Sequence, residues 1–260
     1  MQPSSNPLVL VVSAILFSAV MAEARQGQTP SPATVAAAVQ SKTEGILTDR
    51  LAEGHLSIWK SITAVVFAKD KTGQLKHPRL FALWEKVDTN GHVVFVELVS
   101  QQGAYGGPAG KFRIETLDPG GKRHISSIRL NLPTIERAAV DEGERRDDGC
   151  LPFAGLGNKE RYAEVLGHEL AHAATILGDR EFLRLYQDLE REAGEYHCCL
   201  ASPDRRVDEL EMRLAKIQHL TREFERPARS AELEIWRELL NGRGRIGNIQ
   251  KIAVRLPRQN

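Results

Sequence analysis

The feature that most constrains this chain is the segment 167–173, which reads Gly-His-Glu-Leu-Ala-His-Ala. It lies inside residues 158–177, where apolar residues recur at helical spacing, and Gly178 follows as a stop signal. Residues four apart share one face of a helix, so His168 and His172 are expected one above the other. A second stripe of this helix is apolar, and a helix that is apolar around much of its circumference is usually buried. We therefore expect a central, buried helix that carries two histidines.

Two imidazoles at this spacing can ligate one zinc ion, and Glu169 lies at the edge of the same face. The pattern His-Glu-x-x-His is the signature of the zincin metallopeptidases, and the chain resembles that clan in this motif and in the order of elements around it. The resemblance implies Zn²⁺ as cofactor, His168 and His172 as ligands, and Glu169 as the general base. It also implies hydrolysis of peptide bonds by a zinc-bound water, with Glu169 passing the proton to the leaving amine.

A catalytic zinc usually takes a third protein ligand. The metzincin pattern is disfavoured, because Thr175 and Gly178 occupy the positions where it needs a glycine and a ligand. The gluzincin pattern places a glutamate on a later helix, and the run 230–236 resembles the Glu-x-x-apolar-Trp form seen there. The resemblance thus implies Glu232 as the third ligand, with Glu234 as the second choice. The two side chains point about 200° apart on a helix, so only one of them can face the metal.

Several assignments stay open at this point. Glu195 and His197 are further candidates for the third ligand. The donor that stabilises the oxyanion is not decided among Tyr196, His197, Arg243 and Arg245. The strand at 124–131 is the expected edge strand for an extended protein or peptide substrate, a placement that comes from the zincin resemblance.

Two other functions compete with an active peptidase. One is a catalytically inactive zincin-like extracytoplasmic binding domain. The other is a metal-dependent hydrolase or effector with a non-peptide or very narrow substrate. The formal net charge of +1 argues against nucleic acid as a partner. The oligomeric state is open, because the apolar seam at 203–225 suits internal packing, which we favour, as well as a dimer contact.

Residues 1–24 are expected to form a signal peptide, with an apolar run at 8–22 that ends in small residues. The alternative is an uncleaved anchor or a buried helix. A cleaved signal predicts a secreted or periplasmic protein, without stable membrane insertion, whose residues 25–260 form a single domain. In that compartment Cys150 is expected to pair with Cys198 or Cys199, although a vicinal Cys198–Cys199 bond and three reduced thiols remain open.

The predicted fold class is α+β, with a largely antiparallel sheet at 43–131, a helical part at 133–240 and a tail at 241–260. Strands are expected at 62–68, 79–87, 92–99, 111–117 and 124–131, with hairpin turns at 88–91 and 118–121. The segment 103–110 is expected to be a glycine-rich connector. Helices are expected at 33–40, 43–60, 133–140, 158–177, 180–195, 203–225 and 228–240, the last two separated by Pro227, and 249–256 is expected to be extended.

Overall fold

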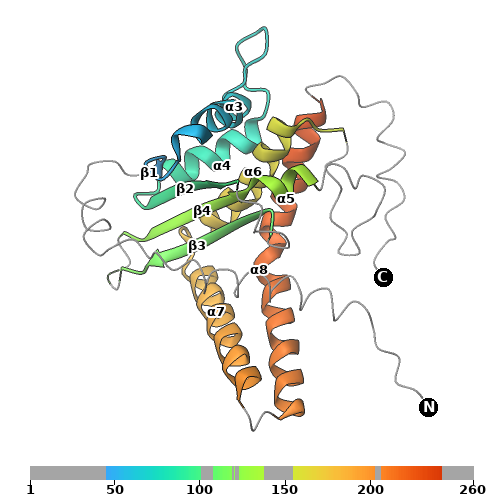
Figure 1. The fold of residues 1–260 in the computed structure, drawn as a ribbon. Coiled ribbons are helices and arrows are strands. Elements are labelled where there is room, and N and C mark those ends of the chain that lie inside the picture. The colour runs from blue at the N-terminus through green and yellow to red at the C-terminus, as the bar shows by residue number, and fades with distance from the viewer. Residues whose placement is uncertain are drawn as a thin grey trace, which may run out of the picture.

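The computed structural model describes residues 45–100, 108–118, 120, 123–137, 155–202 and 206–241. In this part the chain is mixed α+β, as predicted, with one four-stranded sheet and helices packed on it (Figure 1). The helix that carries the histidine motif, α6 (Asn158–Ile176), lies against the sheet and is covered in turn by α3, α4 and α8. Fourteen of its residues are buried, which confirms the predicted central helix.

The sheet has the order β1-β2-β4-β3, formed by β1 (Gly45–Leu47), β2 (Val93–Val99), β4 (Ile125–Asn131) and β3 (Gly110–Thr116). β1, β2 and β4 are mutually parallel, and only β3 runs antiparallel to its neighbour β4. The prediction of a largely antiparallel sheet was therefore wrong. The continuous apolar run Val93–Val96 is fully buried, which is typical of a parallel strand covered on both faces.

The predicted edge strand was also wrong. The strand at 124–131 corresponds to β4, which lies between β2 and β3 in the interior of the sheet. The edge next to α6 is β3, and β3 and β4 form the antiparallel pair that the sequence predicted. Chain order misled this assignment, because the last strand before the motif helix was inserted between two earlier ones.

Two segments predicted as strands are helices. Most of the predicted strand 62–68 lies in α3 (Leu56–Val66), and the predicted strand 79–87 lies in α4 (Pro78–Asp88). The first predicted hairpin is therefore absent, because α4 takes the place of its first strand while the second is β2. In α4 the buried residues Leu80, Leu83 and Val87 recur at helical spacing, and proline stands in the first turn, where its missing N–H costs nothing. The predicted helix 43–60 was wrong over most of its length, since it holds β1 and a 3-10 turn at Glu53–His55 before α3 begins.

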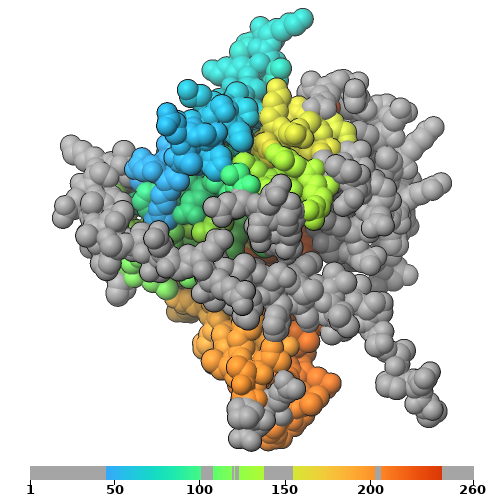
Figure 2. Space-filling view, in the orientation of Figure 1, coloured from blue at the N-terminus to red at the C-terminus, as the bar shows by residue number. Residues whose placement is uncertain are grey.

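The C-terminal helices form a long hairpin. α7 (Arg180–Ala201) extends beyond its predicted end, and α8 (Val207–Asn241) is one continuous helix with Pro227 inside it. The predicted break at Pro227 was wrong. The distal parts of α7 and α8 extend away from the sheet and its helices (Figures 1 and 2). A short helix, α5 (Leu132–Arg137), follows β4 near the predicted position, although residues 138–140 lie outside the described part.

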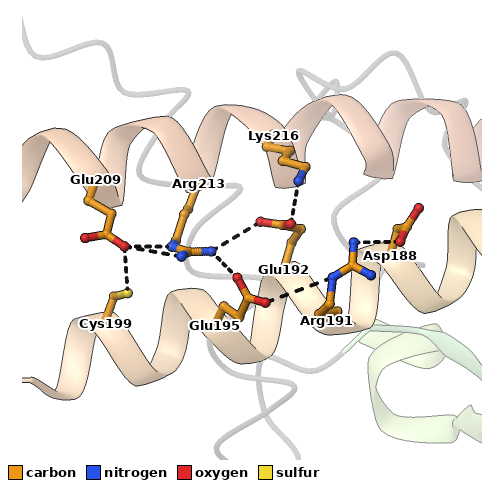
Figure 3. Close-up of polar contacts among 8 residues, drawn as sticks. All are labelled: Asp188, Arg191, Glu192, Glu195, Cys199, Glu209, Arg213 and Lys216. Atoms are coloured by element: carbon orange, nitrogen blue, oxygen red, sulfur yellow. Dashed lines mark hydrogen bonds and ion pairs between the residues drawn. The ribbon is translucent and has the colours of Figure 1, made fainter.

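Ion pairs line much of the contact between α7 and α8 (Figure 3). Glu192 is buried and accepts from Lys216 at 2.5 Å and from Arg213 at 3.4 Å. Arg213 also contacts Glu195 and, at 3.2 Å, Glu209, whose carboxylate in turn accepts from the thiol of Cys199. The distal hairpin is thus held together by charged groups more than by an apolar core.

Several predictions fall on residues outside the described part. These are the signal peptide, the helix at 33–40, most of the connector at 103–110, the tail at 249–256, Cys150, Arg243 and Arg245. Cys198 and Cys199 are both free thiols, so they form no bond with each other. Among the described helices, none is long and apolar enough to cross a membrane.

Candidate metal centre

Two glycines allow the elements of the site to come close together. A Cβ at Gly167 on α6 would overlap with Cδ1 of Ile235 on α8 and lie 3.0 Å from Cδ1 of Leu80 on α4. A Cβ at Gly110 on β3 would lie 2.5 Å from Oε1 of Glu169. The edge strand β3 and the helix α8 therefore flank the motif face of α6 at distances that larger residues would not permit.

The motif histidines face each other as their spacing predicts. The ring centroids of His168 and His172 are 4.8 Å apart, and their Nε2 atoms are separated by 3.1 Å. Two nitrogens this close, each with a lone pair available, can bind one cation between them.

The carboxylate that joins the histidines is Glu225 on α8. One of its oxygens lies 3.3 Å from Nε2 of His168 and the other 3.5 Å from Nε2 of His172. These three residues form the group of potential metal ligands in the described part of the chain. A tetrahedral zinc with bonds of about 2.0–2.1 Å would hold its ligand atoms about 3.3–3.4 Å apart. The two histidine nitrogens are 3.1 Å apart, and each lies 3.3–3.5 Å from a different oxygen of Glu225. With one ligand atom taken from each residue, the three atoms lie within 4.8 Å of one another, close enough to surround one ion.

Glu232 contacts the other side of the same histidine. Its carboxylate oxygen lies 3.1 Å from Nδ1 of His168, while Nε2 faces Glu225. An Nδ1–H that donates to Glu232 places the proton on that nitrogen and leaves the Nε2 lone pair for a ligand. On the second histidine, the ring of Phe224 stacks on His172 with centroids 4.4 Å apart.

Glu169 is 5% exposed and lies between α6 and β3. Burial raises its pKa, because the charged carboxylate loses water, while His168, His172 and a backbone hydrogen bond from Phe112 oppose the rise. A carboxyl group with a raised pKa beside the two histidines is suited to take up and release a proton.

The electrostatics of the group favour a positive charge at its centre. Burial lowers the pKa of His168, but its contacts with Glu225 and Glu232 and the charge of Glu169 raise it more, to a value well above the usual range. Burial would raise the pKa of Glu225, yet hydrogen bonds to both histidines hold it well below the usual range. The carboxylates that raise the pKa of His168 would equally stabilise a bound cation.

The remaining predicted site residues lie elsewhere. Glu234 points to Arg79 on α4, with 2.8 Å between the charged atoms. Glu195 belongs to the ion pairs of the hairpin, and the ring of His197 contacts Tyr196 with centroids 5.9 Å apart. None of these four is in the group of potential ligand atoms found in the described residues.

Glu225 was not predicted as a ligand because the predicted helix 203–225 ends at that residue. Glu225 and Glu232 are seven residues apart, which is close to two helical turns, so they share a face only if the helix continues through Pro227. If the helix had been predicted as continuous, Glu225 and Glu232 on one face would have indicated two carboxylates directed at the motif helix.

Comparisons of the chain with protein-family models, with curated proteins and with solved structures find no match.

Proposed function

We propose that the chain is a zinc-dependent metallopeptidase with a zincin-like arrangement of the gluzincin type. The observation that carries the proposal is the group of His168 and His172 on α6 and Glu225 on α8, whose potential ligand atoms lie within 4.8 Å of one another. The order of sheet, motif helix and later glutamate-bearing helix supports the same assignment. In place of the predicted Glu232, we propose Glu225 as the third ligand.

The donor set suits zinc. Two imidazole nitrogens and one carboxylate oxygen are ligands found in catalytic zinc sites, which leave a fourth position to water or substrate. When bound, zinc polarises a carbonyl group and lowers the pKa of coordinated water towards neutrality.

The protein residues then have separate tasks. The carboxylate oxygens of Glu169 accept a proton from water and return it to the leaving amine, a role that its burial and raised pKa support. Glu232 accepts from Nδ1 of His168 and keeps the imidazole in the tautomer and orientation that the ion needs.

The outer edge of β3, which pairs with no further strand among the described residues, supports a peptide as the substrate. Gly110 on this strand is in direct contact with Glu169, so an extended chain added to the edge would pass the proposed base. Strand addition binds any peptide backbone through main-chain hydrogen bonds. The sheet edge that we propose for substrate is β3 and not the predicted strand at 124–131.

The test is metal analysis combined with the activity of Glu169→Gln on a peptide mixture. We expect about one zinc per chain in the wild type and in Glu169→Gln, with turnover reduced about 10²- to 10⁴-fold by loss of the proton acceptor. Glu234→Gln is the matched control, since that residue pairs with Arg79, and it should keep both metal and activity.

Each alternative has its own outcome. A purified protein without zinc would overturn the proposal. Zinc without cleavage of any peptide would indicate a binding domain or a hydrolase acting on another substrate.

A further inference from the structure

The outer edge of β3 alternates in a defined register. The N–H of Asn131 donates to the carbonyl oxygen of Ala109 at 2.8 Å, which fixes 109, 111 and 113 as the residues hydrogen-bonded to β4. Gly110, Phe112 and Ile114 therefore turn their backbone N–H and C=O groups away from β4, towards the free edge. These are the groups that an added peptide strand would use.

Two of these outward N–H groups are already bound by side chains of the chain itself. Phe112 makes its backbone hydrogen bond to the carboxylate of Glu169. The N–H of Ile114 donates to the hydroxyl of Tyr186 on α7, at 3.4 Å. Tyr186 thus contacts the strand at Ile114, the next outward-facing residue after Phe112, which contacts the proposed base Glu169.

Tyr186 is held firmly in this place. The residue is 8% exposed. Its ring makes an edge-to-face contact with the ring of Phe112, with centroids 6.5 Å apart. On its other side it contacts Phe224 at 5.9 Å, and Phe224 stacks on His172. Packing on both sides holds the phenol between the sheet edge and the metal-binding face.

We propose that Tyr186 caps the outer edge of β3 at Ile114, so that a bound peptide can pair with this edge only at Gly110 and through the carbonyl group of Phe112. This inference rests on the proposed peptidase function. A peptide added antiparallel, which is the slightly more stable pairing, places its residues N-terminal to the cleaved bond towards Ile114. The enzyme then gains no affinity from peptide residues added beyond the first few on that side.

The test uses Tyr186→Phe, which keeps the ring and removes the hydroxyl that caps Ile114. Cleaved bonds are first located by mass spectrometry of a peptide mixture digested by the wild type. End-blocked peptides are then made around one such bond, differing only in the number of residues on its N-terminal side. In the wild type we expect KM to be constant once this side exceeds the first few residues. In Tyr186→Phe the released N–H adds one backbone hydrogen bond, and KM for the longer peptides should fall about fivefold relative to the shorter ones.

Tyr162→Phe is the matched control. It removes a hydroxyl from α6 that donates to Glu136 and not to the backbone of β3, and its length dependence should follow the wild type. The same length dependence in Tyr186→Phe and the wild type would overturn the proposal.

A second measurement needs no substrate and separates this inference from the proposed function. Amide hydrogen exchange at Ile114 should be faster in Tyr186→Phe than in the wild type and in Tyr162→Phe. Unchanged exchange at Ile114 would show that Tyr186 does not protect this N–H, whether or not the protein is a peptidase. If exchange is faster in Tyr186→Phe but the wild type cleaves no peptide, the contact of Tyr186 with Ile114 is confirmed and its role in substrate length is refuted.

Discussion

Glu225 and Glu232 contact different nitrogens of one histidine, and this difference decides their roles. Glu225 faces Nε2 of His168 together with Nε2 of His172, while Glu232 faces Nδ1 of His168. A carboxylate beside Nε2 can bind the proposed ion directly. A residue on Nδ1 acts on the ion only through the orientation and basicity of the imidazole.

We therefore expect Glu225→Gln and Glu232→Gln to differ in zinc affinity. Glu232→Gln should weaken zinc binding about 10- to 100-fold, the usual effect of losing a carboxylate behind a ligating histidine. Glu225→Gln should weaken it more, because a charged ligand atom is lost. Competition with a chelator measures both, and Glu234→Gln should match the wild type. A larger loss in Glu232→Gln than in Glu225→Gln would restore the ligand that the sequence predicted.

The residues of the motif could be predicted because their pattern is local. His168, Glu169 and His172 lie within one turn and a half of a helix whose end is marked in the sequence by Gly178, just after its last turn. The third ligand could not be predicted in the same way. Its position depends on how α8 packs across α6, which no local pattern encodes.

At the scale of the elements, the closeness of α6 and α8 depends on Gly167. A methyl group there would overlap with Cδ1 of Ile235, a fully buried side chain in the hydrophobic core. Either this side chain would have to adopt another rotamer or α8, which carries both glutamates, would have to move away from the histidines.

Gly167→Ala is therefore expected to destabilise the protein, although alanine is the better helix former. Overpacking of this kind costs about 1–3 kcal/mol, against a gain of up to about 1 kcal/mol in helix propensity. Gly194→Ala on α7 is the matched control, because a Cβ there meets nothing within 4 Å, and it should be neutral or stabilising. Urea unfolding measures both variants. Equal stability of the two would show that Gly167 does not limit the approach of α8.

The errors in element type have a physical origin in short apolar runs. The segments at 62–68 and 79–87 are rich in aromatic and β-branched residues, which favour strands when considered alone. The buried residues Ile62, Val65 and Val66 already follow helical spacing, but the run is short, and only with Trp59 does the pattern extend over two turns. Packing against α6 stabilises α3 and α4 as helices. Pro227 is tolerated inside α8 because this helix packs on both α6 and α7.

At the scale of the whole molecule, two buried histidines join the start of β2 to the start of β4. The Nδ1 atom of His92 accepts from the N–H of His124 at 3.0 Å, and Nδ1 of His124 accepts from the N–H of Asp118 at 3.2 Å. The rings stack with centroids 5.0 Å apart. Protonation at Nδ1 would turn each acceptor into a donor facing another donor.

These two histidines are accordingly expected to lower the free energy of unfolding in mild acid. Burial lowers the pKa of His92, helped by His124 and opposed by the carbonyl of Leu177, and burial lowers the pKa of His124 against the charge of Asp118. In the unfolded chain both pKa values return to about 6.5. At these two sites the unfolded chain then binds more protons, so their contribution to stability is complete above pH 6.5 and falls below it, by at most about 1.4 kcal/mol per pH unit for each histidine. The raised pKa of His168 acts in the opposite sense, so this contribution is measured by comparing variants.

Urea unfolding at pH 8 and at pH 5.5 measures this effect. His124→Asn keeps a side-chain acceptor and removes the proton site, so the loss of stability between the two pH values should be smaller than in the wild type. His219→Asn, at an exposed position on α8, is the control and should leave the loss unchanged. An equal loss in His124→Asn and the wild type would contradict the assignment.

The continuity of α8 has a mechanical consequence. Its 35 residues form a rod of about 50 Å that reaches from the core to the far end of the hairpin, with Glu225 near its midpoint. Ile235 is fully buried and lies about 15 Å along the axis from Glu225. A tilt of about 5° around that point would displace Glu225 by about 1.3 Å, enough to break the proposed bond to an ion. A partner that pulled on the hairpin tip would therefore be expected to act on the proposed ligand through the helix.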